Sequence, residues 1–356
     1  MNYRLFTPGP AEINLDIFKI IKRGIPYHRE ESFSALFSRI ETKLKNMLYL
    51  EDGRVYILTC SGTGAMEAAV LNIFDEKDRV LVVSTGKFGD RWMDICNIWS
   101  IPTELIRFDN GKSIDVDMVM KKIKKGNYTG ILTTLTETST GALNDIESMG
   151  KELNKKAIFV VDAIAGFGAD QLKASEWGVD VVVGGSQKTL TSPPGIAFLG
   201  ISKRVVEKIK KRKKPKSYYF DLFTYESFLK RGETPYTPAI LTLLYMDKIL
   251  SIIERKGYEN FIKIHERWAG FVRKNAKNLG FRIFPENPSN ALVVISTKKK
   301  SSLYIKQILK KFKILFANGQ KELKNKIIRI GMMGHANKKD AELILEALKY
   351  AKRRVE

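Results

Sequence analysis

Lys188 is the residue of this sequence best placed to do covalent chemistry. It follows the short β-branched run Val181–Val183, paired glycines and a polar turn, and a Pro-Pro-Gly bend comes soon after it. A β-branched run predicts a buried strand. A lysine at the end of such a strand is shielded from water, which lowers the pKa of its amine and favours the nucleophilic form. The alternative is an ordinary surface lysine, since the chain contains 61 lysines and arginines.

Two further features would complement such a lysine. Asp162 ends the continuous apolar run 157–161, where a carboxylate is costly unless a cation or a donor faces it. The turn Ser61-Gly62-Thr63-Gly64 lies between a predicted strand at 55–59 and a helical segment at 65–71. N–H groups at a helix N-terminus favour a phosphate, and the two hydroxyl residues add donors. An ordinary turn with a capping serine is the alternative, and the missing GKS or GKT ending argues against ATP.

Other polar and aromatic residues follow strands of the same region. Phe88 lies between two glycines after a predicted strand at 79–83, and Ser139 lies among small hydroxyl residues around Glu137 after a strand at 130–135. Continuous apolar strands that alternate with helices are typical of a parallel sheet covered on both faces. Sites of doubly wound sheets lie at the carboxyl ends of the strands. We therefore expect five residues to converge there: Ser61, Phe88, Ser139, Asp162 and Lys188.

The length of 356 residues predicts two domains. We predict an α/β protein with a doubly wound, mostly parallel sheet in a large domain spanning 11–244. A smaller α/β C-terminal domain would comprise 245–356 together with 1–10. Further helices are predicted at 15–22, 32–49, 116–125, 146–154, 240–253, 258–279, 302–312 and 338–353, and strands at 103–108, 281–284, 291–296 and 325–331, with Phe198 closing another.

The formal net charge of +22 raises the question of nucleic-acid binding. The densest basic run is 208–214, and the nearest aromatic residues, Tyr218 and Tyr219, follow it. Nucleic-acid grooves usually interleave the two types, so a solvated basic surface is favoured. A non-enzymatic basic binding protein stays open as an alternative, although it leaves the strand-end residues unexplained. A positive field also attracts small carboxylate substrates.

Targeting and metal-binding signals are missing from the sequence. No apolar run approaches the roughly 20 residues that span a bilayer, and the first residues contain no apolar signal segment. Cys60 and Cys96 are the two cysteines, which gives neither a disulfide framework nor metal-ligand spacing. We expect a cytoplasmic protein with no metal site, no membrane contact and no nucleic-acid partner.

A lysine amine, an aspartate and a phosphate-binding turn together make up a site for pyridoxal 5'-phosphate. The amine forms an imine with the cofactor aldehyde, and the aspartate keeps the ring nitrogen protonated so that the ring accepts electrons. Phe88 would stack on the ring. Arg329, in the strand predicted at 325–331, would hold a substrate carboxylate with its two-pronged guanidinium.

These residues give the chain a resemblance to class V, fold-type I pyridoxal-phosphate aminotransferases of the serine/alanine–glyoxylate or –pyruvate group. The likeness runs over essentially the whole length and is closest to short prokaryotic members called aspartate aminotransferases. Its most specific signal is Gly185-Ser186-Gln187-Lys188 with Pro-Pro-Gly behind it. The other matching stretches are Thr7-Pro8-Gly9-Pro10, His28-Arg29, Ser61–Gly64, Gly86–Gly89, Glu137–Gly141, Asp162 and Arg329–Gly331.

The resemblance implies a role for each matching residue. Lys188 would carry the cofactor and act as base and acid of the proton shift, with Asp162 on the ring nitrogen. Arg329 and Gly9 would bind the substrate. The family's members are homodimers with sites at the subunit interface. The implied cofactor-binding residues are Ser61, Gly62, Thr63 (often histidine in relatives), Phe88, Ser139, Asp162, Ile164, Gln187, Lys188 and, from the neighbouring subunit, Tyr236 and Thr237.

The expected reaction is a ping-pong Schiff-base transfer of an amino group. A small amino acid (alanine, serine or aspartate) would be the donor and a 2-oxo acid, glyoxylate or pyruvate, the acceptor. An aspartate–2-oxoglutarate aminotransferase is the alternative, which needs a second cation; His28-Arg29 is one candidate. A cysteine desulfurase is disfavoured because no cysteine follows Cys96 and because Gln187 stands where those enzymes usually have histidine.

Overall fold

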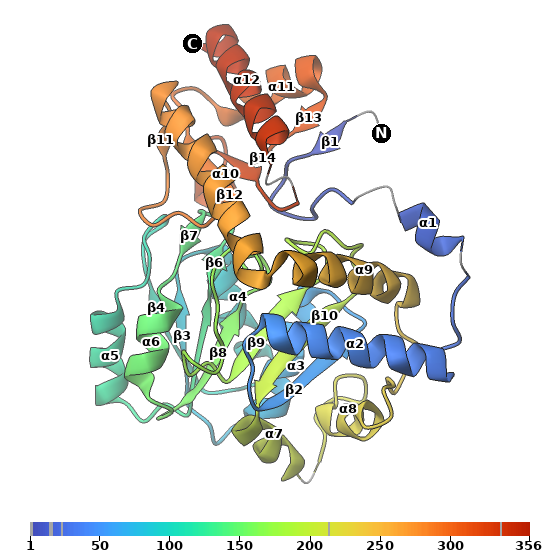
Figure 1. Ribbon diagram of the computed structural model, residues 1–356. Helices are drawn as coiled ribbons and strands as arrows, with labels where there is room; N and C mark the ends of the chain where they lie inside the picture. Colours follow the sequence, from blue (N-terminus) through green and yellow to red (C-terminus); the bar gives the residue numbers. More distant parts are fainter. Residues whose placement is uncertain (1–2, 14–16, 23, 213, 335–336) are drawn as a thin grey trace.

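The main sheet contains seven strands in the order β2-β10-β9-β8-β5-β3-β4. The computed structural model describes residues 3–13, 17–22, 24–212, 214–334 and 337–356 (Figure 1). Strand β10 is antiparallel to both of its neighbours, so the other strands share one direction and the sheet is mostly parallel, as predicted. The strands are β2 (Gly53–Leu58), β3 (Val80–Ser84), β4 (Thr103–Arg107), β5 (Gly130–Thr134), β8 (Ile158–Asp162), β9 (Val181–Gly185) and β10 (Ala197–Ser202).

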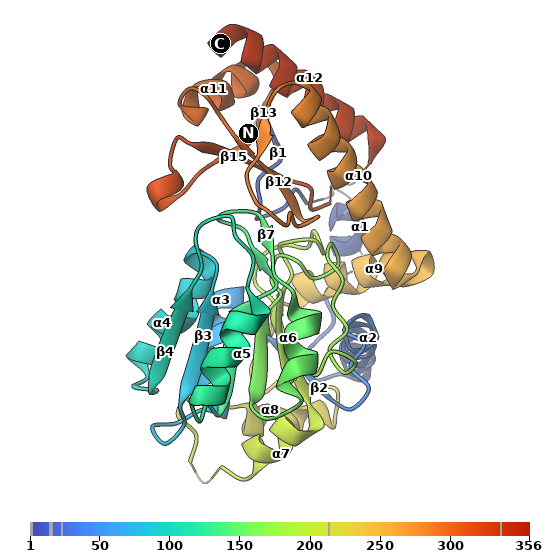
Figure 2. The same ribbon diagram turned by 90° about the vertical axis from the view of Figure 1, so that its left-hand side faces the viewer.

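Helices cover this sheet and bury its apolar strands. The helices α3 (Gly62–Ile73) and α4 (Lys87–Ile98) pack on each other, α3 against β9 and α4 against β3. Figure 2 shows α5 (Val116–Lys125) and α6 (Ile146–Leu153) side by side on the sheet. Because both faces are covered, the runs Val80–Val83 and Val181–Val183 are fully buried, which explains their continuous apolar character.

A second, antiparallel sheet lies above the first in Figure 1, with the order β11-β12-β15-β14. Its own hydrophobic core includes Phe6, Val293 and Ile330. The N-terminal β1 (Arg4–Leu5) pairs with β13 (Ile314–Leu315) beside it. The remaining elements are β11 (Arg282–Ile283), β12 (Leu292–Ser296), β14 (Ala317–Asn318), β15 (Ile327–Gly331), α10 (Tyr258–Asn278), α11 (Ser301–Phe312), the short 3-10 helix η1 (Lys321–Leu323) and α12 (Lys338–Val355).

Helix α9 (Ile240–Lys256) connects the two regions. Its buried residues Leu243, Met246 and Leu250 belong to the core of the main sheet. The predicted boundary between residues 244 and 245 therefore falls inside a helix. The division into domains 11–244 and 245–356 stays a prediction.

Several element bounds differ from those predicted. Phe198 does not close a strand but stands near the start of β10, because the apolar run continues to Ile201. The helices α4, α7 (Lys203–Lys210) and α8 (Leu222–Leu229) were not predicted, nor was the small hairpin of β6 (Thr136–Glu137) and β7 (Ala142–Leu143). Of the helix predicted at 15–22, residues 15 and 16 lie outside the described residues, as does Lys213 of the basic run, and α1 spans Ile17–Ile21. Helix α2 spans Glu31–Met47.

The described residues contain neither a membrane-spanning helix nor a cluster of metal-ligating side chains. In that part of the chain, no helix combines the length and the apolar character needed to cross a bilayer. The same residues contain no group of three or more His, Cys, Asp or Glu side chains arranged to hold a metal ion.

Candidate active site

A cavity lies at the carboxyl ends of the parallel strands. Four of the five residues expected to converge there line it: Ser61, Phe88, Asp162 and Lys188. Ser61, Phe88 and Lys188 follow β2, β3 and β9, and Asp162 is the last residue of β8. The shared direction of these strands brings their ends to one edge of the sheet. The remaining lining residues are Gly62, Thr63, Arg91, Thr136, Thr138, Ile164, Ala165 and Gln187.

Lys188 points its amine at the N-terminal turn. Its Nζ donates a hydrogen bond of 2.7 Å to the carbonyl oxygen of Pro8. Burial lowers the pKa of this amine to about 8, and the charge of Asp162 opposes the shift. Gly9 has a φ of +116°, and a Cβ atom added there would overlap the Lys188 amine. The turn Thr7–Pro10 therefore closes over the lysine, and only glycine fits at position 9.

Asp162 is a buried carboxylate at the end of β8, with 6% of its surface exposed. Burial raises its pKa to about 7, while a 2.8 Å hydrogen bond from the Ile164 N–H to Oδ1 works against that shift. Ile164 also lies against Gly62, where an added Cβ would come within 2.5 Å of the Ile164 Cδ1. The aspartate, the isoleucine and the glycine turn are thus packed as one wall of the cavity.

The turn at Ser61 begins helix α3. Ser61 is the N-cap residue, and its side chain accepts a 3.4 Å hydrogen bond from the Gly64 N–H. The capping interpretation is confirmed, and the anion site stays a prediction. Ser61 and Thr63 are exposed and line the cavity. The first N–H groups of α3 face outward there, where they favour negative charge.

Arg91 is a cavity residue that the sequence analysis missed. Its Nη1 donates a 2.9 Å hydrogen bond to the Thr63 Oγ1, and its guanidinium carbon lies 4.9 Å from the Phe88 ring centroid. Phe88 and Arg91 are three residues apart on α4, so they lie on one face of the helix. That spacing was the available signal, but among so many basic residues it did not single out Arg91.

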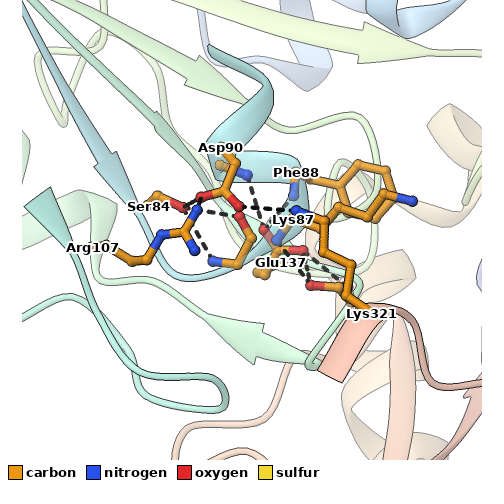
Figure 3. A network of polar contacts seen from close by, with 10 residues as sticks. Ser84, Lys87, Phe88, Asp90, Arg107, Glu137 and Lys321 are labelled. Carbon is orange, nitrogen blue, oxygen red and sulfur yellow. Dashed lines mark hydrogen bonds and ion pairs between the residues drawn. The ribbon is translucent and has the colours of Figure 1, made fainter. Parts of the chain in front are cut away.

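Glu137 holds the first turn of α4, as Figure 3 shows. Its side chain is completely buried and accepts hydrogen bonds of 2.9 Å from the N–H groups of Phe88 and Gly89. Ser139 donates from its N–H at 2.9 Å and from its hydroxyl at 2.6 Å. Burial raises the pKa of Glu137, and these donors oppose the shift. The carboxylate thus fixes the backbone that carries Phe88.

Ser139 is the fifth expected residue, and the structure puts it beside the cavity rather than in its lining. Its hydroxyl donates a hydrogen bond to Glu137 and accepts one of 3.2 Å from the Lys87 N–H. It lines an adjoining cavity with Lys87 and Gln320, while Thr136 and Thr138 line the main one. Its predicted contact with the cofactor stays a prediction.

Arg329 joins the second sheet to the site from β15. Its side chain is buried, with Nε donating to the Asn318 carbonyl at 2.9 Å and Nη1 donating to the Thr138 carbonyl at 3.0 Å. Burial lowers its pKa, and the Glu137 charge opposes that shift. Because Thr138 lines the cavity, the guanidinium stands directly behind the cavity wall.

Gln187 presents a side-chain oxygen to the site. Its side chain lines the cavity, and its buried Oε1 has no hydrogen-bond partner within the described part of the chain. Buried polar atoms are nearly always paired in native proteins. An unpaired side-chain oxygen in the lining of a cavity is therefore a position at which a ligand can supply the missing hydrogen-bond partner.

The stretches His28-Arg29 and Tyr236-Thr237 meet each other, and none of these four residues lines the cavity. Arg29 donates to the Glu233 carboxylate at 2.9 Å and to the carbonyls of Thr234 and Pro235 at 2.7 and 3.2 Å. His28 lies 3.4 Å from the Thr237 hydroxyl, and the Tyr236 hydroxyl donates to the Tyr218 carbonyl at 2.7 Å. Arg29 is thus engaged in holding the loop 233–238 and is no longer a candidate cation for a substrate in the cavity of its own chain.

Comparison with known proteins assigns this chain to a family. Residues 21–344 match the family model of the class V aminotransferases. The soluble hydrogenase 42 kDa subunit of Anabaena cylindrica is 32% identical, over 94% of this chain and 89% of the relative. The L-aspartate–glyoxylate aminotransferase of Paracoccus denitrificans is 27% identical, over 93% and 86%. The crystal structure of an aspartate aminotransferase of subgroup IV from Thermus thermophilus is 28% identical, with a TM-score of 0.92 over 99% of this chain and 100% of that one.

The chain belongs to the class V aminotransferase family and is a transaminase. Its architecture is that of the fold-type I pyridoxal-phosphate aminotransferases. Enzymes of the family depend in general on pyridoxal phosphate and act on amino acids and 2-oxo acids. The resemblance inferred from the sequence motifs is therefore confirmed.

Proposed function

We propose that this chain binds pyridoxal 5'-phosphate in the strand-end cavity. With it, the chain transfers the amino group of a small amino acid (alanine, serine or aspartate) to glyoxylate or pyruvate. The observation that carries the proposal is the presence of Lys188 and Asp162 in one cavity, an amine with a lowered pKa and a carboxylate with a raised one. Such opposed shifts are typical of sites that move protons. An L-aspartate–glyoxylate aminotransferase among the relatives supports the choice of substrates.

The lining residues fit this cofactor. Asp162 is a buried acid that suits a protonated ring nitrogen, and Phe88 and Ile164 offer apolar surfaces to a flat ring. The N-terminus of α3 suits a phosphate, with the hydroxyls of Ser61 and Thr63 beside it. Gln187 adds a buried side-chain oxygen that has no partner among the described residues. The predicted contacts of Ser61, Gly62, Thr63, Gln187 and Ile164 are part of the proposal.

The chain's own residues would transfer one proton and bind one carboxylate. The bound cofactor supplies an electron sink that makes the α-proton of an amino acid acidic. With a pKa of about 8, the Lys188 amine is suited to take that proton and to return it near neutral pH. Arg329 would hold the α-carboxylate, which amino acids and 2-oxo acids share. One guanidinium therefore serves both halves of a ping-pong reaction.

The cofactor and the lysine are tested together. We expect the purified protein to be yellow, with a visible absorption band, and to transfer amino groups in a panel of alanine, serine and aspartate against glyoxylate, pyruvate and 2-oxoglutarate. Lys188→Ala should lose both the band and turnover. Lys151→Ala, on the exposed side of α6, is the control and should change neither. A wild-type protein that stays colourless and takes up no added pyridoxal phosphate would refute the proposal.

Arg329→Lys tests the carboxylate site. A single ammonium group cannot hold the Thr138 carbonyl and a substrate carboxylate in the fork geometry of arginine. We expect KM to rise about tenfold, or ~1.4 kcal/mol, for every carboxylate substrate. Arg273→Lys is a matched control, because Arg273 is also held by a carbonyl, that of Ser289 at 2.9 Å, but does not line the cavity. An unchanged KM in Arg329→Lys would exclude this role.

We further propose that the enzyme is a homodimer in which the loop 233–238 completes the neighbouring subunit's site. Large aromatic side chains around this loop are exposed: Tyr27 by 63%, Tyr218 by 85% and Phe223 by 55%. Tyr27 packs 5.0 Å from the ring of His28, and Tyr218 packs 5.7 Å from that of Tyr236. An exposed aromatic patch next to a loop that does not line its own chain's cavity supports a second copy as the partner.

A further inference from the structure

Arg91 links the first turn of α4 to the first turn of α3. It donates to the Thr63 hydroxyl and lies over the Phe88 ring, and both of those residues line the cavity. Among the described residues no carboxylate lies within ion-pair distance of its guanidinium. Its positive charge therefore has no ion-pair partner in that part of the chain; it lines the cavity and acts at longer range on Asp162 and Lys188.

The hydrogen bond between Arg91 and Thr63 has only one possible direction. A guanidinium has no acceptor, so the Thr63 oxygen must accept. A hydroxyl has one proton to donate besides its lone pairs, and within the described residues no acceptor is paired with that proton. Because Arg91 occupies one lone pair of the Thr63 oxygen, the hydroxyl proton points away from the guanidinium. That proton therefore stays available to a ligand in the cavity.

An available hydroxyl proton at this place suits an anion. Thr63 lies at the N-terminus of α3, where unpaired N–H groups and the helix dipole already favour negative charge. Arg91 adds a full positive charge one hydroxyl away. Hydrogen bonds to an ionised acceptor are the stronger kind, so the orientation of one hydroxyl is worth a measurable change in affinity.

We propose that Arg91 is a positioning residue for the cofactor phosphate: it orients the Thr63 hydroxyl as a donor toward the phosphate and adds positive charge beside it. The proposal rests on the proposed function, because it takes the phosphate of pyridoxal phosphate as the anion at α3. It assigns to a residue on α4 a role that acts through a side chain on α3.

Equilibrium binding to the apoprotein tests this role. Pyridoxal phosphate and pyridoxal, which lacks the phosphate, are titrated calorimetrically into wild type, Arg91→Met, Thr63→Val and the double variant. Each single variant should lose about tenfold in affinity for pyridoxal phosphate, and the double variant should lose no more than the worse single one. Affinity for pyridoxal should change less than about twofold in all of them, since the lost contacts are to the phosphate.

Two further variants complete the experiment. Arg91→Lys keeps the charge and one donor, so we expect an intermediate affinity; it also carries the test if Arg91→Met does not fold. Arg107→Met is the control. Arg107 pairs with Asp90 of α4 but does not line the cavity, so this variant should bind both compounds like wild type.

Each of the remaining outcomes of the binding experiment contradicts one part of the proposal. Losses that multiply in the double variant would mean that Arg91 does not act through Thr63. Equal losses for pyridoxal phosphate and pyridoxal would assign Arg91 to the Phe88 ring or to the fold alone. A wild-type apoprotein that binds neither compound would refute the proposed function itself, which separates that failure from a failure of the role of Arg91.

Discussion

Lys188 and Asp162 have pKa values shifted in opposite directions by the same cause. Burial disfavours the charged form of each, so the amine loses its proton more easily, at about 8, and the carboxyl keeps its proton longer, to about 7. The attraction between the two charges only partly offsets the free energy lost when both groups are removed from water. A ligand with an aldehyde for the amine and a protonated nitrogen for the carboxylate relieves both. The two residues are thus arranged for binding at the expense of the empty protein's stability.

The lowered pKa of Lys188 predicts the pH dependence of cofactor uptake. Below the pKa the amine is protonated and cannot attack an aldehyde, so the uptake rate of the apoprotein should rise with a midpoint near 8. Asp162→Asn should move the midpoint lower, because the Asp162 charge is what raises the lysine's pKa against burial. Stopped-flow absorbance from pH 6 to 10 would measure both curves. The cofactor's own ionisation is common to both proteins, so a midpoint that does not move would contradict the coupling.

At the scale of elements, much of the site could be predicted from the sequence because parallel strands end at one edge. The apolar runs before Asp162 and Lys188 predict buried strands, and the position of a residue at the end of such a strand is largely fixed by the sheet. Arg91 was not predictable in this way, because a helical arginine one turn after Phe88 resembles any solvated one. Its role depends on how α3 and α4 pack together, which no local pattern encodes.

Two other features depend on tertiary contacts. The direction of the Ser139 side chain follows from its bond to the buried Glu137, and the loop 233–238 is held by Arg29 from 204 positions away. Helix α8 was missed because its sequence is apolar on most sides and has no clear period. Strand-end positions could thus be predicted, whereas side-chain directions and long-range anchors could not.

Glu137 should control the order of the first turn of α4. Glu137→Ala leaves the N–H groups of Phe88 and Gly89 unpaired in a buried place, so we expect a loss of about 3 kcal/mol in the free energy of unfolding and faster amide exchange at those two residues. Urea unfolding and hydrogen exchange measure the two effects. Glu147→Ala, which removes an exposed ion pair on α6, should cost less than about 0.5 kcal/mol. Unchanged exchange at Phe88 would contradict the capping role.

In the whole molecule, three distant parts of the chain contribute to the site: the N-terminal segment, the main sheet and the second sheet. The N-terminal segment is tied to the second sheet by β1 and by the hydrogen bond of 2.8 Å from the Gly331 N–H to the Phe6 carbonyl. The next residues bring the Pro8 carbonyl to Lys188. Across the same boundary, Lys321 lies 3.6 Å from Asp90 of α4 (Figure 3). A movement of the second sheet would therefore shift the turn over Lys188 and the Arg329 guanidinium together.

The proposed dimer predicts complementation between two defective subunits. One carries Lys188→Ala; the other carries Tyr236→Phe and Thr237→Val in the loop proposed to reach its partner. In a mixed dimer, the subunit that keeps Lys188 receives an intact loop from its neighbour, while the second site lacks both. Random mixing after unfolding and refolding makes half of the dimers mixed, so activity should reach about a quarter of the wild-type value at a cofactor concentration where the loop variant alone is inactive. The control is the same mixture prepared without refolding, in which subunits have not exchanged. If the loop served its own chain, or if the enzyme were a monomer by light scattering, mixing would restore nothing beyond the sum of the two variants.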